Sequence, residues 1–157
     1  MRAVVIHAAQ DLRIEEQSPL PAPAAGEVRI NMAVGGICGS DLHYYNHGGF
    51  GAVRLRQPMV LGHEVSGHIA AVGDGVTGLV SDQLVAVSPS RPCAKCDYCL
   101  RGQPNHCENM RFYGSAMPYP HIQGAFSQEP IVDARQCVPA DDLSPEAPPI
   151  AEPVAAS

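Results

Sequence analysis

Four of the six cysteines in the chain stand close together in a C-x2-C-x2-C-x7-C run. Two-residue gaps let consecutive thiolates wind around one ion, and the seven-residue return brings the fourth, so the run can close a tetrahedral all-sulfur shell around zinc. The alternatives are disulfides, which overlapping C-x-x-C spacings would make crowded and ambiguous, or a redox pair formed by one C-x-x-C. The spacing favours a structural zinc loop with four ligands, Cys93, Cys96, Cys99 and Cys107.

The chain is long enough for one domain with a real core, and two full domains are not expected in 157 residues. Hydrophobic residues make up 45% of it, which excludes a disordered chain. The 15 glycines and 15 prolines, without any tryptophan, argue against a bundle of long helices. The composition therefore favours short strands that are joined by many turns.

The charge of the chain excludes some partners. Its formal net charge is -6, and four thiolates with one zinc ion would take it to about -8. Such an acidic surface favours neither nucleic acid nor anionic lipid. The first apolar run is short and is interrupted by Gln10 and Asp11, so neither a signal peptide nor a membrane span is expected. Clustered metal-spaced cysteines without an exporting segment favour the cytoplasm.

Alternation of apolar and polar residues predicts short strands at 2–7, 11–16, 27–34, 83–89, 125–132 and 136–139, and a turn that enters a strand over 59–73. Ser40 and Asp41 could cap a short helix, and the glycine-rich stretch 46–58 is expected to be mobile. Ser144 and Pro145 are suited to opening a last helix. The rhythm predicts a mainly β domain, barrel-like or sandwich-like, with short helices.

A second group of metal-competent residues comprises Cys38, His63 and Glu64. A catalytic zinc takes three protein ligands and keeps one position open, and these residue types are all competent donors. Both segments, GGICGSD and VLGHEVSG, are glycine-flanked turns where side chains can converge. Each residue also has an ordinary structural interpretation: a small buried thiol, a hydrogen-bonded turn histidine and a solvated charge. Cys137 has no spaced partner and is interpreted as a packing residue.

The segments GGICGSDLHYY and PMVLGHEVSGHIAAVG, followed by the four-cysteine loop, resemble the zinc-containing medium-chain dehydrogenases. The stretches HYYNHGGFG and MRFYGSAM most resemble the polyol dehydrogenases, L-idonate 5-dehydrogenase above all, with sorbitol dehydrogenases sharing much of the pattern. The resemblance implies a GroES-like, partly open β-barrel over 1–143 that includes a zinc lobe at 90–110. Residues 144–157 would then begin the helix that leads to a nucleotide-binding domain.

The resemblance also implies a role for each matching residue. Cys38 and His63 would bind a catalytic zinc, with Glu64 as a ligand that exchanges with water. Asp41 would hold the distal nitrogen of His63 and fix its tautomer. The four-cysteine lobe would bind a second, structural zinc, so that the chain carries two.

Four further residues would handle the substrate. Ser40 would touch its hydroxyl, and His43 would pass the proton on towards solvent. Tyr44 and Glu152 match positions that face the substrate or the zinc-bound water in polyol dehydrogenases. The substrate implied is a small-molecule polyol or sugar acid.

The implied reaction oxidises a secondary alcohol to a ketone, with zinc as a Lewis acid and hydride passing to NAD or NADP. The glycines of AVGDGVTG, which include Gly73 and Gly75, form only a turn with no helix pattern after it, and no βαβ unit that could seat a dinucleotide is present. The cofactor is therefore expected to bind through a domain outside the chain, and the chain alone is expected to be inactive. The whole protein is expected to be a homo-oligomer. Two alternatives stay open: a stand-alone zinc-stabilised binding or assembly module, and a relative of the zinc-free quinone reductases. Two, one or no zinc ions per chain would separate the three.

Overall fold

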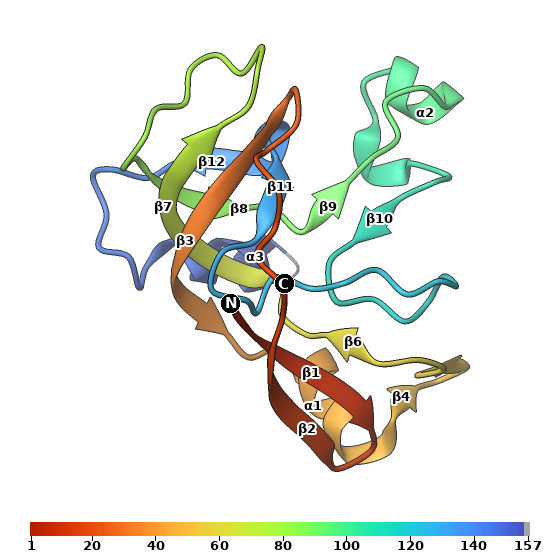
Figure 1. Cartoon of the computed structure of the whole chain (residues 1–157). Coiled ribbons are helices and arrows are strands. Elements are labelled where there is room, and N and C mark those ends of the chain that lie inside the picture. The colour runs from red at the N-terminus through yellow and green to blue at the C-terminus, as the bar shows by residue number, and fades with distance from the viewer. Residues whose placement is uncertain (156–157) are drawn as a thin grey trace.

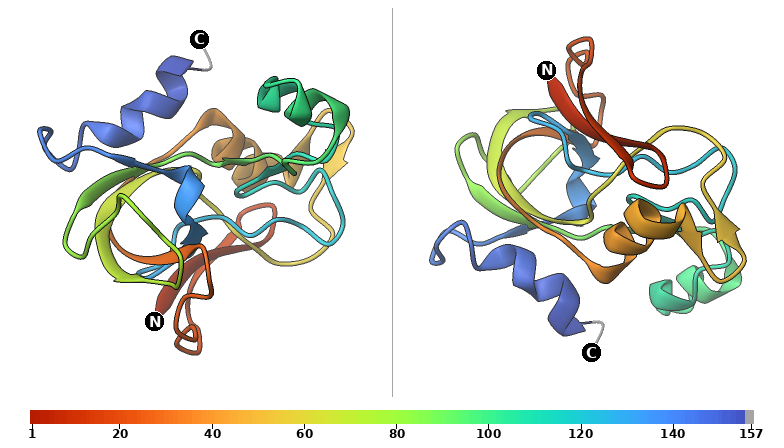
Figure 2. Two further views of the ribbon diagram at one scale, coloured as in Figure 1. Left: turned by 90° about the horizontal axis from the view of Figure 1, so that it is seen from above. Right: turned by 90° about the horizontal axis from the view of Figure 1, so that it is seen from below.

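The computed structural model describes residues 1–155, and its main body is an antiparallel five-stranded sheet (Figure 1). In spatial order its strands are β11 (Ile131–Asp133), β3 (Glu27–Gly36), β7 (Glu64–Val72), β8 (Leu84–Val87) and β12 (Cys137–Pro139). The edge strands β11 and β12 are joined only by the three-residue 3-10 turn η2 (Ala134–Gln136). The sheet must therefore curl until its edges approach, and Figure 2 shows the resulting partly open barrel.

The interior of this barrel follows from the alternation in its strands. Val28 and Ile30 of β3 point inward and are buried, while their neighbours are more exposed. They form one cluster with Val65 and Ile69 of β7 and Val85 of β8. The register between β3 and β7 shifts at two places, and such irregularities increase strand twist and help the sheet to close.

A second sheet packs below the barrel and contains β2 (Asp11–Glu16), β1 (Arg2–Ala8) and β6 (Met59–Val60). Helix α1 (Gly39–His47) lies beside it and is followed by a small hairpin of β4 (Gly49–Phe50) and β5 (Val53–Arg54). The 46–58 stretch thus contains regular structure, and its mobility stays a prediction. The positive φ angles of Gly48, Gly49 and Gly51 let the chain turn there.

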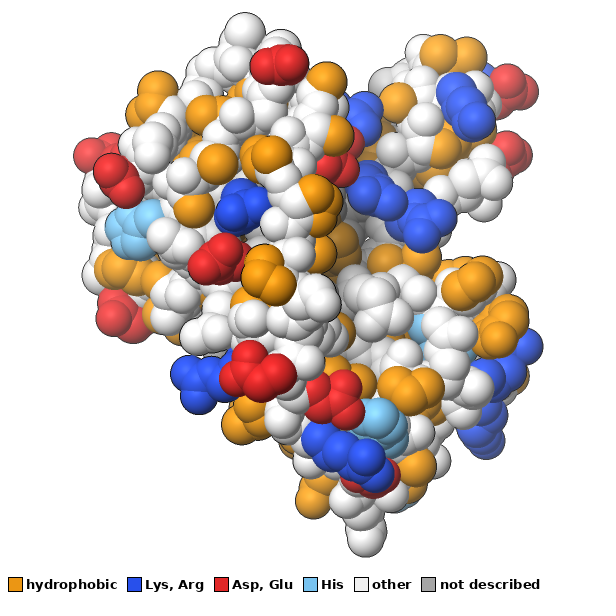
Figure 3. Space-filling view, viewed as in Figure 1, with side chains coloured by type: hydrophobic (Ala, Val, Ile, Leu, Met, Phe, Trp, Pro, Cys, Tyr) orange, Lys and Arg blue, Asp and Glu red, His pale blue; other side chains and the backbone are white. Residues whose placement is uncertain are grey.

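The cysteine run forms a lobe that projects from the body (Figures 1 and 3). Its base is a two-stranded ribbon of β9 (Ser90–Arg91) and β10 (Arg111–Phe112), and its tip carries α2 (Asp97–Leu100) and the 3-10 turn η1 (Pro104–His106). The ribbon connects the lobe to the rest of the fold.

The chain reaches its last helix later than expected. The 3-10 turn η3 (Pro148–Ile150) precedes α3 (Ala151–Ala155), so no helix opens at Ser144. Consecutive prolines lack N–H donors and delay the regular helix. Residues 156–157, the end of the segment predicted to be helical, lie outside the described residues.

The predicted 125–132 strand pairs regularly only from Ile131 onward. Its earlier part bridges the two sheets instead: Phe126 accepts a hydrogen bond from the Val4 N–H, and Gln128 accepts one from the Met32 N–H. The mainly β, barrel-like architecture is nevertheless confirmed. Over the described range 1–155, no helix is long and apolar enough to cross a membrane.

Phe126 lies where the two sheets meet and packs against all three hydrophobic clusters of the domain. Its ring lies over Gly35 and Gly62, where an added Cβ would collide with it. These glycines leave the space that the ring fills. The junction between the barrel and the second sheet therefore depends on one aromatic side chain.

Replacing Phe126 with alanine should lower the free energy of unfolding by about 2 to 3 kcal/mol. Removing a fully buried ring costs more, but Phe126 is only half-buried and has fewer packing contacts to lose. Denaturant unfolding of both proteins measures the difference. Leu100→Ala is the control, because Leu100 is 73% exposed and should change stability by less than about 0.5 kcal/mol. Equal effects of the two substitutions would contradict the role given to Phe126.

Candidate functional site

The Asp41 carboxylate connects two turns that are far apart in the sequence. Its Oδ2 accepts a hydrogen bond from the Cys38 N–H at 3.0 Å, and its Oδ1 accepts one from the Gly62 N–H at 3.4 Å. Asp41 is the third residue of α1, and Cys38 is the N-cap, so the first bond belongs to a capping box. The expectation that Ser40 and Asp41 supply the cap is corrected here: Asp41 satisfies the capping residue's N–H from inside the helix.

The two turns bring Cys38, His63 and Glu64 together. Their ligand atoms all lie within 4.8 Å of one another, and His63 and Glu64 are 4% and 7% exposed. Glu64 begins β7 directly opposite Gly36, the last residue of β3. A Cβ at Gly36 would collide with the Glu64 carboxylate, so the glycine makes room for that side chain.

This group fits a zinc ion. Thiolate, imidazole and carboxylate are the donors that catalytic zinc sites use. The buried Nδ1 of His63 has no hydrogen-bond partner within the described structure, and the nearest carboxylate oxygen is Asp41 Oδ1 at 3.9 Å. Asp41 therefore lies on the Nδ1 side of the ring and leaves Nε2 as the nitrogen available to a metal, but at 3.9 Å it makes no hydrogen bond to Nδ1. Its role in holding this ring stays a prediction.

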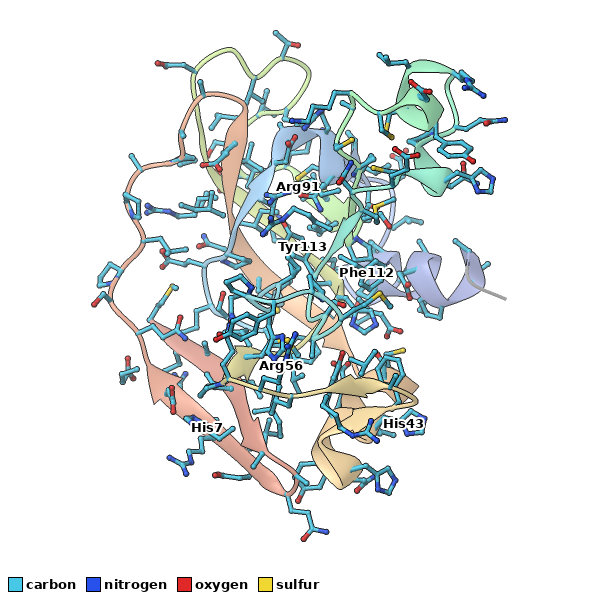
Figure 4. All side chains as sticks on the ribbon, turned by 90° about the vertical axis from the view of Figure 1, so that its right-hand side faces the viewer. His7, His43, Arg56, Arg91, Phe112 and Tyr113 are labelled. Atoms are coloured by element: carbon cyan, nitrogen blue, oxygen red, sulfur yellow. The ribbon has the colours of Figure 1, made fainter. Side chains whose placement is uncertain are left out.

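Ser40 and His43 lie three residues apart on α1, so they share a face of that helix. Ser40 is half-buried, whereas His43 is exposed, and its ring lies 6.1 Å from that of Phe50 (Figure 4). The order from buried to exposed matches a path for a proton towards solvent. The relay itself stays a prediction.

Tyr44 is placed differently from what the resemblance implied. Its side chain is 2% exposed and packs with Ile6, Met59 and Leu61 in the core. The hydroxyl accepts a hydrogen bond from the Ala116 N–H at 2.9 Å, and burial raises the pKa of the phenol. In this structure Tyr44 is therefore a buried core residue, and the substrate-facing role that the resemblance implied stays a prediction.

Glu152 reaches the same cleft as Glu64. A cavity of about 370 Å³ is lined by both carboxylates, by Ser88 and Ser90, and by apolar residues of β8 and α3. The fully buried Ser66 of β7 donates a hydrogen bond to the Pro145 carbonyl at 2.6 Å. This bond ties the segment before α3 to the barrel and so delivers Glu152 to the cleft.

The four lobe cysteines also converge, with all four sulfurs within 4.8 Å of one another. Cys96 Sγ and Cys107 Sγ are 4.0 Å apart. A tetrahedral shell with Zn–S bonds of about 2.3 Å separates its sulfurs by about 3.8 Å, so the spacing fits zinc. No disulfide forms among the six cysteines, all of which lie within residues 1–155.

Backbone N–H groups prepare these sulfurs for a cation. The Lys95 N–H lowers the pKa of Cys93 to about 6, and Cys107 Sγ accepts N–H bonds from Cys93 and Asn109 at 3.2 and 3.4 Å. Desolvation and the neighbouring sulfurs raise the pKa of Cys99 to about 12. The lobe thus favours deprotonation of some cysteines, but it disfavours four thiolates together until a cation offsets their charge.

Two residues near the site were missed by sequence reasoning. Phe112 of β10 lies with its ring centroid 5.4 Å from that of His63, and Ser66 holds the terminal segment. Nothing in the spacing of either residue signals these contacts, because both depend on which strands become neighbours. Their positions follow from the tertiary fold alone.

Asp41→Ala should lower the free energy of unfolding by about 1 to 3 kcal/mol, because it leaves the N–H groups of Cys38 and Gly62 without an acceptor. It should also weaken metal binding by Cys38, His63 and Glu64 about 10- to 100-fold. Chemical denaturation and metal titration measure the two effects. Asp74→Ala, at an exposed turn, is the control. An Asp41→Ala protein with unchanged metal affinity would contradict the linking role.

A family model described as the alcohol dehydrogenase GroES-like domain matches residues 24–142. L-idonate 5-dehydrogenase (NAD(P)(+)) of Escherichia coli K12 is 46% identical over 110 residues, which are 70% of this chain and 32% of that protein. A sorbitol dehydrogenase of Bacillus subtilis 168 is 40% identical over 128 residues, 82% of this chain and 35% of that protein. The chain spans about a third of the length of these relatives.

Solved structures agree with this. The L-idonate 5-dehydrogenase of Escherichia coli K-12 superposes with a TM-score of 0.79 at 41% identity, covering 88% of this chain and 39% of that chain. Galactitol-1-phosphate dehydrogenase from Escherichia coli superposes with a TM-score of 0.85 at 32% identity, covering 98% of this chain and 42% of that chain. The GroES-like fold and the resemblance to polyol dehydrogenases are confirmed, and the chain belongs to the alcohol dehydrogenase GroES-like domain family.

Proposed function

We propose that this chain is the zinc-binding catalytic part of an NAD(P)-dependent dehydrogenase that oxidises a secondary alcohol of a polyol or sugar acid to a ketone. The observation that carries this proposal is the convergence of Cys38, His63 and Glu64, because Glu64 also lines the cleft that Glu152 reaches. The similarity to L-idonate 5-dehydrogenase and sorbitol dehydrogenases supports the substrate class.

A zinc ion held by Cys38, His63 and Glu64 would act as a Lewis acid and lower the pKa of a substrate hydroxyl. Ser40 would accept the proton of that hydroxyl through a hydrogen bond, and His43, one turn further along α1, would release it to solvent. Asp41 Oδ1 lies 3.9 Å from His63 Nδ1, and it would fix the tautomer of the imidazole by closing that distance to a hydrogen bond.

The cleft supplies contacts for further hydroxyl groups. Ser88, Ser90 and Glu152 are its polar lining residues beside Glu64, and apolar side chains of β8 and α3 line it as well. A polyol presents several hydroxyls that hydrogen-bond to such groups. A simple alcohol would use fewer of these contacts.

The hydride acceptor would be NAD or NADP, bound by a further domain to which residues 144–157 lead. One similar solved structure, the RspB dehydrogenase of Escherichia coli CFT073, is described as complexed with NADH. It is 34% identical, with a TM-score of 0.81 over 98% of this chain and 42% of that chain. We expect the 157-residue chain by itself to bind zinc without oxidising alcohols. Homo-oligomeric assembly and a cytoplasmic location of the whole protein stay predictions.

Elemental analysis of the chain purified without added metal should give two zinc ions per chain. Cys38→Ser/His63→Ala should reduce the ratio to one, because the lobe keeps its own ion. The matched control, Cys137→Ala/His68→Ala, removes the same residue types away from the site and should keep two. A ratio of one in every protein would leave only the lobe metallated, and a zinc-stabilised binding or assembly module would then replace the proposed enzyme.

The two centres should differ in what they do for stability. Cys96→Ser should lower the melting temperature more than Cys38→Ser, because a structural zinc contributes directly to folding free energy while a catalytic zinc sits in a barrel that packs without it. Differential scanning calorimetry on the two variants gives the comparison. Equal shifts would refute this division of roles.

A further inference from the structure

One short ribbon joins the two candidate metal centres. In the β9–β10 pair, Ser90 lies opposite Phe112 and Arg91 lies opposite Arg111. Beyond this ribbon the chain enters the lobe at Cys93, two residues after β9, and returns from it at Cys107, four residues before β10. At the other end, Phe112 contacts His63 and Ser90 lines the cleft with Glu64.

The ribbon is weak by itself. It has two residue pairs and one further backbone bond, from the Tyr113 N–H to the Pro89 carbonyl at 3.2 Å, and isolated two-stranded ribbons are marginal in water. Arg91 and Arg111 place like charges directly across from each other, an arrangement that destabilises strand pairing. Neither guanidinium forms an ion pair within residues 1–155. Basic side chains gather where the lobe meets the body (Figure 3).

The lobe supplies a strand-to-strand contact and, when loaded, a negative charge that stabilise the ribbon. The Cys93 N–H donates to Cys107 Sγ at 3.2 Å, which joins the two strands just beyond their ends. A zinc ion bound by four thiolates carries a net charge of about -2, which would offset the two arginines. A loaded lobe therefore closes the ribbon both geometrically and electrostatically.

His63 depends on what packs against it. Its ring is 4% exposed, and its Nδ1 lacks a hydrogen bond, so side-chain packing has a large share in orienting the imidazole. Within residues 1–155, Phe112 provides the ring contact of His63, with centroids 5.4 Å apart and planes tilted by 55°. Figure 4 shows Phe112 between the lobe and α1.

We propose that Phe112 is a positioning residue that couples the two metal sites. When the lobe is loaded, the closed ribbon holds Phe112 against His63 and keeps the imidazole aligned with Cys38 and Glu64. When the lobe is empty, the ribbon loosens, and the affinity of those three residues for metal falls. The proposal rests on the proposed function, because it requires both centres to bind metal.

The test measures metal affinity at the catalytic centre. Protein with a zinc-loaded lobe and a chelator-emptied catalytic centre is titrated with Co²⁺, whose visible spectrum reports its ligand geometry. Phe112→Ala should raise the Kd for Co²⁺ about tenfold or more and alter the spectrum, with one zinc still bound per chain. Phe112→Tyr, which keeps the ring, should restore both. Tyr98→Ala is the control, because Tyr98 is an aromatic residue of the lobe that lies beside His106 and away from His63.

A second arm tests the coupling. Cys99→Ser should weaken Co²⁺ binding at the catalytic centre when Phe112 is present and have little further effect in the Phe112→Ala background. The proposal is overturned if Phe112→Ala leaves both the Kd and the spectrum unchanged, and this result does not depend on the folding of the cysteine variant. The proposal is also overturned if Cys99→Ser lowers the Co²⁺ affinity of the catalytic centre equally with and without Phe112. A wild-type chain that takes no Co²⁺ would overturn the proposed function as well, so the two failures are distinguishable.

Discussion

The buried carboxylate of Asp41 accepts N–H bonds from Cys38 and Gly62, which belong to turns at the ends of two neighbouring strands. A buried carboxylate is costly unless it is hydrogen-bonded, and each bond to a charged acceptor contributes about 1.5 to 3 kcal/mol. Its place in the first turn of α1 adds a favourable interaction with the helix dipole. The two turns are therefore held at a fixed separation, and this separation brings Cys38 close to His63 and Glu64.

The barrel delivers these turns to each other. β3 ends at Gly36 and β7 begins at Glu64, and the two residues are directly paired. The chain leaves β3 towards Cys38 and enters β7 from His63, so the antiparallel register places both ligands at one end of the barrel. Phe126 fills the space above Gly35 and Gly62 and keeps this end packed against the second sheet.

The two metal centres were not equally predictable from the sequence. The lobe is local, with all four ligands between Cys93 and Cys107, so spacing alone predicts it. The other centre depends on a pairing between distant strands: donor chemistry made Cys38, His63 and Glu64 candidates, and the family resemblance favoured their convergence over the ordinary structural interpretation. Alternation predicted most strands because each has one buried and one exposed face.

Where the structure differs from the sequence pattern, the causes are tertiary. Glycine content led to the expectation of a mobile stretch at 46–58, and the left-handed angles that glycine permits produce a hairpin within it. A motif assigned Tyr44 to the substrate, and in this structure the core closes over its ring. The roles of Ser66 and Phe112 come from contacts across the fold, and no local pattern records them.

X-ray absorption spectroscopy at the zinc edge tests the central claim most directly, because it counts the ligands of zinc in the chain without requiring activity. The account predicts two zinc ions with five sulfur ligands in total, four in the lobe and one from Cys38, which is an average of 2.5 sulfurs per zinc. Nitrogen and oxygen atoms complete the direct coordination of the ion bound by Cys38. An average of four sulfurs, with no nitrogen or oxygen ligand, would mean that zinc occupies the lobe alone. The turns that Asp41 joins would then not form a second metal centre, and this result would contradict the account.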